Sequence, residues 1–347
     1  MTLNSSGPIS LGGPVVGQSI EIENGDVGTI QISLNDSAIR SLAGNLSGPI
    51  SIANLYGKTQ RFTINYTFTS STPNATLNVT TLTKYRAGVS DITVTVNSGV
   101  YLYATSTSNY GLQLTGGTTG DTLNLINNGY IAGRGGDGGA SYYHYGGNTY
   151  VWVGSVGGPA LSIGYNTTLV NNSFIGGGGG GGMLMGGGGA GGGNGGRNNG
   201  SVCSNGGGPG ASGGGGTTLS CVGTGGGGGR IFPGSGAGAG VIGIGAGQGG
   251  GGGGAGGAGG TYCSCFAPPN TYAGYGGSGG GAGGPPGNYN GYPGGGGGGG
   301  GWGASGGGGP AGVNSFYTPG SPGGNAIVKN GNTLTINVTG TIYGGQV

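Results

Sequence analysis

The run Gly176-Gly-Gly-Gly-Gly-Gly-Gly182 is one of several uninterrupted glycine runs between residues 133 and 324, a stretch that holds most of the 106 glycines of this 347-residue chain. The hydrophobic effect cannot fold such a stretch, because it scales with buried apolar area and glycine has almost none. Glycine also loses the most backbone entropy on ordering. The stretch is therefore either a flexible linker or an ordered bundle of extended threefold helices of the polyglycine II type, whose bare backbones pack closely and exchange hydrogen bonds.

The residues that interrupt the glycine runs favour the ordered bundle. A linker is usually interrupted by Ser, Gln, Glu and Lys, whereas the interruptions here are mainly aromatic and apolar, such as Tyr262-Cys-Ser-Cys-Phe266 and Tyr289-Asn-Gly-Tyr-Pro293. No strict Gly-X-Y period runs through the stretch, which excludes a collagen helix. We predict a bundle of polyglycine II helices over residues 176–324, with the aromatic interruptions in loops at its distal end.

Charged residues are sparse and unevenly placed. All seven carboxylates and six of the nine basic residues lie at or before Asp137, and the remainder of the chain holds Arg197, Arg230 and Lys329 without any acid. Carboxylate pairs of glycosidases, oxygen-ligand cation sites and Ser-His-Asp triads all require an acid, and nucleic-acid binding requires clustered bases. We therefore expect a protein that is not an enzyme, holds no metal or other cofactor and binds no nucleic acid.

The sequence shows no targeting signal. The segment that begins at Met1 has neither the basic n-region nor the apolar core of a secretory signal, and no apolar run reaches membrane-spanning length. These features predict a protein made in the cytoplasm and not inserted in a membrane.

Residues 1–58 are expected to form a small docking element. The segments Ser19–Glu23 and Thr29–Leu34 alternate in a strand-like way. The pair Asn35-Asp36 offers an N-cap for a short helix that Gly44 would end. We predict a mainly β element that is too small to be stable alone and is completed by a partner.

Several phrases in this element resemble the N-terminal segment of many bacteriophage tail-fibre and tail-tip proteins. They are Ser5-Ser-Gly-Pro-Ile-Ser-Leu11, Ile32-Ser-Leu-Asn-Asp-Ser-Ala-Ile-Arg40, Leu42-Ala-Gly44 and Ser51-Ile-Ala-Asn-Leu-Tyr-Gly-Lys58. The resemblance covers about the first sixth of the chain. It implies that residues 1–58 attach the chain to a tail-fibre or tail-tip virion protein, and that the protein is located in the tail of a virion after synthesis in the host cytoplasm.

Residues 59–175 alternate with the period of two that is typical of β-structure, as in Phe62–Phe68 and Ile92–Val96. An internal repeat follows, because Thr122–Gly133 aligns without gaps on Thr333–Gly344, with a looser copy at Leu169–Gly176. Repeats of short strands joined by glycine turns are typical of stacked parallel coils. We predict a stacked β-coil platform over residues 59–175, completed by residues 325–347, which the glycine stretch leaves near 176 and rejoins near 324.

Stacked β-coils, polyglycine runs and aromatic interruptions together resemble the distal adhesins that cap the long tail fibres of T-even-like phages. In that family the glycine helices form a sandwich, and the variable segments between them form tip loops that bind a bacterial receptor. The resemblance implies an all-β plus polyglycine II fold. It also implies adsorption to a Gram-negative cell through an outer-membrane protein, lipopolysaccharide or another surface glycan. A monomeric cap and a homotrimer fit the sequence equally well.

The candidate receptor-binding residues are the large and the basic side chains of the interruptions. Tyr and Trp offer rigid contact area with a polar group, the methionines offer an apolar patch, and the arginines can bind phosphate or an acidic loop. Some rings, about half by the usual burial of Tyr and Trp, can instead pack on the glycine helices and close the ends of the bundle. The residues are Tyr142, Tyr143, His144, Tyr145, Tyr150, Trp152, Met183, Met185, Arg197, Arg230, Phe232, Tyr262, Phe266, Tyr272, Tyr275, Tyr289, Tyr292, Trp302, Phe316 and Tyr317.

Four cysteines lie in the glycine-rich stretch, Cys203, Cys221, Cys263 and Cys265, and their spacing differs from that of paired C-x₂-C zinc ligands. A bridge within a C-x-C pair is strained, so the disulfide candidates join Cys203 and Cys221 to that pair, or to each other. Such bonds would form after release from the reducing cytosol and would hold the tip loops. The single histidine, His144, has no acid nearby and is expected to be a contact residue rather than a metal ligand.

Two other functions compete with that of an adhesin. The chain can be a structural or assembly protein of the tail, in which case the aromatic interruptions would be buried between virion subunits. It can also be a capsule depolymerase on a β-coil platform. That enzyme would need a carboxylate cluster, and only Asp91, Asp121 and Asp137 lie near the platform.

Overall fold

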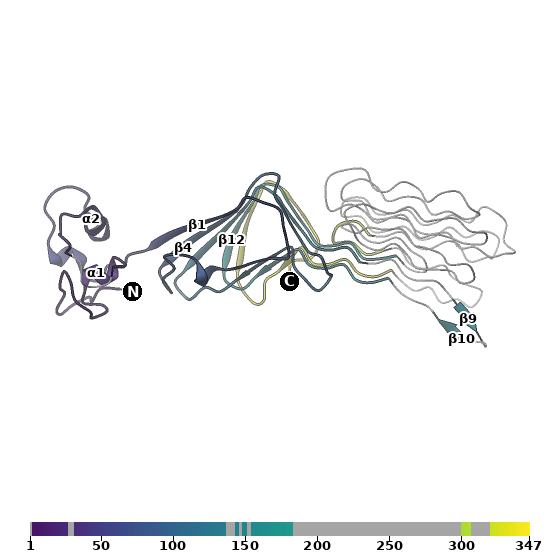
Figure 1. Ribbon diagram of the computed structural model, residues 1–347, viewed down its shortest axis with the longest axis horizontal. Helices are drawn as coiled ribbons and strands as arrows, with labels where there is room; N and C mark the ends of the chain where they lie inside the picture. The colour runs from purple at the N-terminus through teal and green to yellow at the C-terminus, as the bar shows by residue number, and fades with distance from the viewer. Residues whose placement is uncertain are drawn as a thin grey trace. The chain divides into compact units, whose positions relative to one another are not determined.

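The computed structural model describes residues 2–26, 31–136, 143–145, 148–150, 154–182, 300–306 and 320–347, with 143–145 and 148–150 described by their backbone alone. These residues are mostly β-structure with few helices (Figure 1), as predicted for the fold class. The elements are α1 (Ile20–Glu23), α2 (Ser37–Ala43), the 3₁₀ helices η1 (Ile52–Leu55) and η2 (Val79–Thr81), and the strands β1 (Phe62–Phe68), β2 (Thr72–Pro73), β3 (Ala75–Asn78), β4 (Ser90–Val96), β5 (Tyr101–Tyr103), β6 (Leu112–Thr115), β7 (Thr122–Asn127), β8 (Tyr130–Ala132), β9 (Tyr143–Tyr145), β10 (Asn148–Tyr150), β11 (Leu161–Ile163), β12 (Thr167–Asn171), β13 (Phe174–Gly176), β14 (Ile327–Val328), β15 (Leu334–Val338) and β16 (Thr341–Tyr343). None of the helices within the described ranges is long and apolar enough to cross a membrane.

The chain divides into two compact units. The first comprises Met1–Tyr66, Asn78–Thr93 and Gly116–Leu123, and the second comprises Thr67–Leu77, Val94–Thr115 and Asn124–Val347. The strands β1, β4 and β7 have residues in both units.

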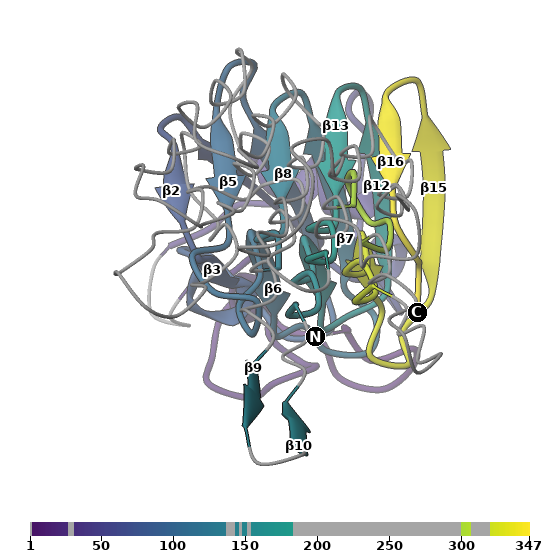
Figure 2. The same ribbon diagram turned by 90° about the vertical axis from the view of Figure 1, so that its right-hand side faces the viewer.

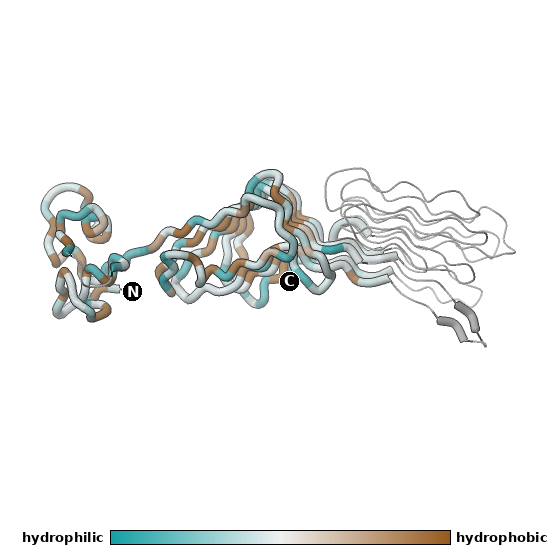
Figure 3. Tube along the Cα trace, in the orientation of Figure 1, coloured by the Kyte–Doolittle hydropathy of each residue, from teal (hydrophilic) through white to brown (hydrophobic). Residues whose placement is uncertain are grey.

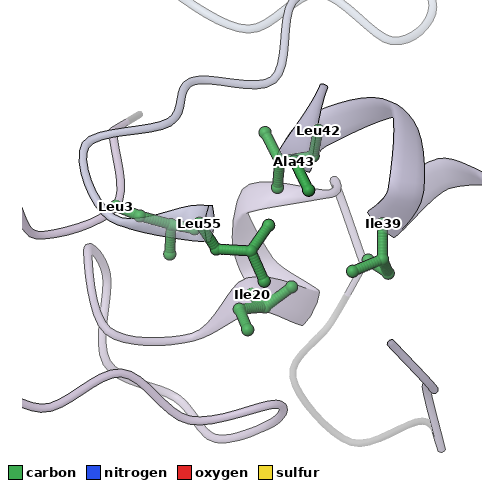
Figure 4. Close-up of a cluster of buried hydrophobic side chains, with 6 residues drawn as sticks. All are labelled: Leu3, Ile20, Ile39, Leu42, Ala43 and Leu55. Atoms are coloured by element: carbon green, nitrogen blue, oxygen red, sulfur yellow. The ribbon is translucent and has the colours of Figure 1, made fainter. Parts of the chain in front are cut away.

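The first unit has a small apolar core built by α1, α2 and η1. Figure 4 shows its buried side chains, which are Leu3, Ile20, Ile39, Leu42, Ala43 and Leu55. The helix predicted after Asn35-Asp36 is confirmed as α2, with Asp36 at its N-cap and Gly44 at its C-cap in the left-handed region at φ +74°. Glycine reaches that region without strain, which makes it the usual residue after a helix.

The prediction that the N-terminal element is mainly β is wrong. Among residues 2–26 and 31–58 the structure has two α-helices, one 3₁₀ helix and only a single β-bridge, between Ser10 and Ser19. The segment read as a strand, Ser19–Glu23, is the helix α1. Its physical cause is the side chain of Ser19, which accepts a hydrogen bond from the backbone N–H of Ile22 and so caps the helix.

The described strands other than β9 and β10 form three sheets that the chain visits in turn. Their orders are β1-β4-β7-β12-β15, β2-β5-β8-β13-β16 and β3-β6-β11-β14. Figure 2 shows β2, β5, β8, β13 and β16 side by side in that order. In the second unit the neighbouring strands pair in parallel, for example β7 with β12 and β12 with β15. Each pass of the chain therefore adds one strand to each sheet, except that the last pass, through β15 and β16, meets the third sheet only at the bridge of Gln346 with Ile327.

The alignment of the internal repeats is confirmed by the register of these strands. Leu169 pairs with Leu125 on one side and Ile336 on the other, as the sequence repeats align them. Ile175 lies in the same way between Ile131 and Ile342. Apolar residues thus recur at neighbouring positions of adjacent strands, which Figure 3 shows as brown patches that line up. Four of these residues are fully buried, namely Leu125, Leu169, Ile131 and Ile175.

Two buried asparagines connect successive passes where the first sheet ends. Asn127 and Asn171 are fully buried and in register. The Nδ2 group of Asn127 donates to Oδ1 of Asn171 over 2.8 Å, and Nδ2 of Asn171 donates to the carbonyl of Thr341 over 3.2 Å. Since a buried amide that is not hydrogen-bonded is costly, these bonds hold the passes in one register.

The glycine-rich excursions leave and rejoin the sheets at equivalent positions. One runs from β8 to β11 and the other from β13 to β14. Their departure points, Ala132 and Gly176, are paired in register, and so are their return points, Leu161 and Ile327. In the preceding pass a short connection from β5 to β6 occupies the same place.

The stability of the first unit is predicted to fall as pH rises above the ordinary pKa of a glutamate. Burial raises the pKa of Glu23, which is 3% exposed, although its Oε1 accepts a hydrogen bond from the backbone N–H of Gln60. A raised folded-state pKa stabilises the protonated form, so this contribution is present at low pH and is lost as pH rises through the raised pKa.

The change Glu23→Gln should flatten this dependence. Amide hydrogen exchange of residues 2–26, corrected for the intrinsic pH dependence of exchange, measures the stability of this region between pH 4 and 8. Equal slopes for the parent and the variant would contradict the prediction.

Candidate receptor-binding region

Most of the predicted contact residues lie outside the part of the chain that the structure describes. The same holds for the four cysteines, so their pairing stays a prediction. The contact residues concerned are Tyr142, Trp152, Met183, Met185, Arg197, Arg230, Phe232, Tyr262, Phe266, Tyr272, Tyr275, Tyr289, Tyr292, Phe316 and Tyr317.

Four predicted contact residues belong to a short antiparallel hairpin. Its strands are β9, with Tyr143, His144 and Tyr145, and β10, which ends at Tyr150. Tyr143 is paired with Tyr150, and His144 with Thr149. The register therefore brings together residues of the two aromatic interruptions that the sequence places before and after Gly146-Gly147.

Five backbone segments rich in glycine lie together beside the ends of the sheets. We number them in chain order as the first to the fifth glycine segment, which are residues 133–136, 154–158, 176–182, 300–306 and 320–324. The chain runs through the third segment directly out of β13. All seven glycines of that segment are buried, although they bring no apolar side chain.

The third segment is hydrogen-bonded to all four others, and each neighbour meets it at every third residue. The backbone N–H groups of Gly133 and Gly136 donate to the carbonyls of Gly176 and Gly179, both over 2.8 Å. The same spacing recurs, over N–O distances of 2.7–3.1 Å, in the donations of Gly178 and Gly181 to Gly158 and Ser155, of Gly303 and Gly300 to Gly177 and Gly180, and of Gly324 and Ser321 to Gly178 and Gly181. The period is three, whereas a β-strand bonds its neighbours with a period of two.

These segments approach so closely that no side chain fits between them. A Cβ atom on Gly178 would overlap the carbonyl of Arg134, and one on Gly180 would overlap the carbonyl of Ser321. Real Cβ atoms do not come this near to backbone atoms. Glycine is therefore required here for close approach of one backbone to another.

Trp302, predicted as a receptor contact, is buried in the described part of the chain. It is 3% exposed and packs with Ala132, Phe174 and Tyr343. Its indole lies edge-on to the ring of Phe174, with the centroids 5.2 Å apart. Trp302 thus packs inside the protein, as the sequence analysis allowed for some of the rings. It is therefore not a candidate receptor contact.

Two of the three carboxylates considered for a depolymerase, Asp91 and Asp121, make hydrogen bonds within the first unit. Asp91 forms an ion pair with Arg61 at 2.7 Å and accepts from Thr122; the hydrogen bond from Arg61 lowers the pKa of Asp91. Asp121 accepts from the backbone N–H groups of Ser90 and Thr118 and from the hydroxyl of Tyr85. Asp137 lies outside the described residues.

Metal-ligand side chains do not gather in the residues described. Groups of three or more His, Cys, Asp or Glu side chains able to hold a metal are absent among them.

The first and second glycine segments lie before residue 176, outside the range that the sequence analysis assigned to the glycine bundle. A signal for the second segment exists, because Gly157-Gly158 and Gly323-Gly324 stand at the same distance before Leu161 and Ile327, where the repeated β11 and β14 begin. A glycine pair shortly before a repeated strand thus predicts that the chain at this point belongs to a glycine segment.

Comparison with known proteins identifies related sequences. Residues 62–231 match the family model described as "Phage tail fibre adhesin Gp38", which confirms the resemblance to phage tail-fibre adhesins. Among solved structures, the chain is similar to the "Crystal structure of the gp37-gp38 adhesin tip complex of the bacteriophage S16 long tail fiber", with 18% identity, a TM-score of 0.42, and coverage of 97% of this chain and 100% of that chain. No curated protein matches the chain.

The change Gly178→Val should destabilise the second unit. Because its Cβ would overlap the backbone of Arg134, the segments must separate, and we expect the melting temperature to fall by about 5 °C or more.

Gly48→Val is the matched control. A Cβ there meets nothing within 4 Å, and only the strain of its φ of +86° applies. Its effect should be smaller and confined to the first unit. Equal melting of the second unit in Gly178→Val and the parent would show that the close packing of these segments is not needed for stability.

Proposed function

We propose that this chain, whose residues 62–231 match the phage tail fibre adhesin family, is the receptor-binding protein of a phage tail or tail-fibre tip. It binds the bacterial surface reversibly and without catalysis. The family match is the observation that carries the proposal. It is supported by Asp91 and Asp121, whose carboxylates are engaged in hydrogen bonds within the fold.

The fold proposed for this function has two parts. The first is the platform, in which successive passes through the three sheets form stacked β-coils. The second is a bundle of polyglycine II helices, of which the five glycine segments are the proximal part. The three-residue period of their hydrogen bonds supports this, because a polyglycine II helix has three residues per turn and directs its bonds to several neighbours.

The proposed partner of residues 1–58 is a tail-fibre or tail-tip virion protein. Its support is the set of large apolar side chains that this part of the chain leaves exposed, namely Val15 at 50%, Val16 at 59% and Leu46 at 78%. Exposed apolar side chains on so small a unit are typical of a surface that another protein covers. This partner would hold the chain, as a monomeric cap or as a homotrimer, in the virion.

The proposed receptor is an outer-membrane protein or lipopolysaccharide of a Gram-negative cell. The candidate contacts are the aromatic, Met and Arg residues between the glycine runs, without Trp302. Tyrosine-rich surfaces with Ser, Asn and Gly neighbours suit protein loops and sugars alike, since they combine rigid contact area with hydrogen-bonding groups.

A structural or assembly protein of the tail is the alternative. The burial of Trp302 favours it to some degree, because it shows that an aromatic residue between glycine runs can serve packing alone. In that case the remaining aromatic residues would contact other virion subunits.

Adsorption to cells tests the proposal. Fluorescently labelled protein is incubated with a panel of Gram-negative strains, each as intact, protease-treated and lipopolysaccharide-truncated cells. We expect the parent to bind one or more strains, and Tyr289→Ala/Tyr292→Ala to bind at least about tenfold more weakly, since buried aromatic contacts dominate such interfaces. The control, Thr335→Ala/Asn337→Ala, removes exposed side chains of β15 and should bind as the parent does.

The treated cells assign the class of receptor. Loss of binding after protease treatment indicates a protein, and loss on truncated cells indicates lipopolysaccharide. If the parent binds no strain that the phage carrying it infects, the proposal fails and the structural alternative replaces it.

A further inference from the structure

One column of the sheet β2-β5-β8-β13-β16 alternates large and small side chains in a way that forms a notch. The register pairs Tyr103 with Ala132, Ala132 with Gly176 and Gly176 with Tyr343. The order across the strands is therefore large, small, small, large. Since residues paired in register lie on the same face, the two small residues leave a depression between the two tyrosines.

Trp302 fills this notch. It packs against Ala132, with Tyr103, Phe174 and Tyr343 around it. A Cβ on Gly176 would lie 2.6 Å from Cζ of Phe174 and 3.3 Å from Cδ2 of the indole, so the two rings together leave no room for a methyl group at this position. The ring of Phe174 meets both Trp302 and Tyr343, at centroid distances of 5.2 and 5.9 Å.

Backbone hydrogen bonds of the two residues after Trp302 connect the fourth glycine segment to the third. The next residue, Gly303, has a φ of +63° and donates its N–H to the carbonyl of Gly177 over 2.7 Å. Ala304 accepts from the N–H of Gly180 over 2.9 Å. The two residues that follow Trp302 are thus both hydrogen-bonded to the third glycine segment.

A large side chain is needed at this point for a physical reason. The glycine segments bury backbone but almost no apolar side chain, so hydrogen bonds alone oppose their large loss of entropy. Net hydrogen-bond energies are small. A buried indole contributes much more through its apolar area, and Trp302 is the one aromatic residue in the glycine segments as described.

We propose that Trp302 is a positioning residue of the adhesin, whose indole locks the fourth glycine segment onto the platform and so sets the register of the glycine bundle that carries the receptor-binding loops. The part concerning receptor binding rests on the function proposed above. The locking itself does not depend on that function.

Hydrogen exchange and fluorescence test the lock on the full chain. In Trp302→Ala we expect the amides of residues 176–182 and 300–306 to exchange at least about tenfold faster than in the parent. Trp302→Phe, which keeps a ring in the notch, should restore much of the protection. Leu125→Ala is the control, because it removes a fully buried side chain of β7 and lowers stability without touching the notch.

A complementary variant fills the notch instead of emptying it. Ala132→Leu should expel the indole, which is read in a Trp152→Phe background where Trp302 is the only tryptophan. We expect a red-shifted emission and stronger quenching by acrylamide. Unchanged emission and quenching in a folded Ala132→Leu protein, or equal exchange in Trp302→Ala and the parent, would overturn the proposal. Faster exchange of the same amides in Leu125→Ala, measured well below its melting temperature, would also overturn the proposal. It would show that these amides respond to the general stability of the protein and not to Trp302 in particular.

The adsorption assay separates the lock from the proposed function. On a strain that the parent binds, Trp302→Ala should lose affinity by on the order of tenfold, with recovery in Trp302→Phe and no loss in Leu125→Ala. Unchanged affinity of Trp302→Ala would overturn the positioning role. If the parent binds no strain, the function proposed above fails, and the lock is still decided by exchange and fluorescence.

Discussion

The constraint on which this structure depends is the approach of backbone to backbone in the glycine segments. Hydrogen bonds from Gly133, Gly178 and Gly303 form only because no Cβ atom stands between the segments. In an ordinary core, side chains supply both the driving force and the spacing between elements. Here the spacing is set by the backbone alone. The driving force must come from elsewhere, chiefly from the apolar interior of the sheets at each end of the excursions.

The platform and the glycine segments therefore have complementary roles. In the platform, residues such as Leu125, Leu169 and Ile131 are fully buried, and the asparagine pair of Asn127 and Asn171 holds the passes in register. This register determines where the third segment starts, at Gly176, and where the fifth ends, at Gly324. Trp302 links the two parts by placing an apolar side chain of the glycine-rich stretch on the outer face of the sheet.

Much of the platform could be predicted from the sequence, because its repeats place like residues at like positions. Aligning Thr122–Gly133 on Thr333–Gly344, with the looser copy at Leu169–Gly176, predicts that strands more than 200 residues apart lie in the same sheet at equivalent positions. The N-terminal helix α1 was missed because one hydrogen bond, from Ile22 to Ser19, outweighs an alternating pattern only five residues long. The burial of Trp302 could not be predicted, since its notch is made by Ala132 and Gly176, which are distant in sequence and come together only through strand register.

The equivalent departure and return points of the two excursions bear on how much the chain between them can vary. Both replace a short connection between the second and third sheets, and both have their ends fixed by the same strand register. Outside the glycine segments and Trp302, the strand register does not prescribe the length or the sequence of an excursion. That outer part could therefore vary between related chains without disturbing the sheets.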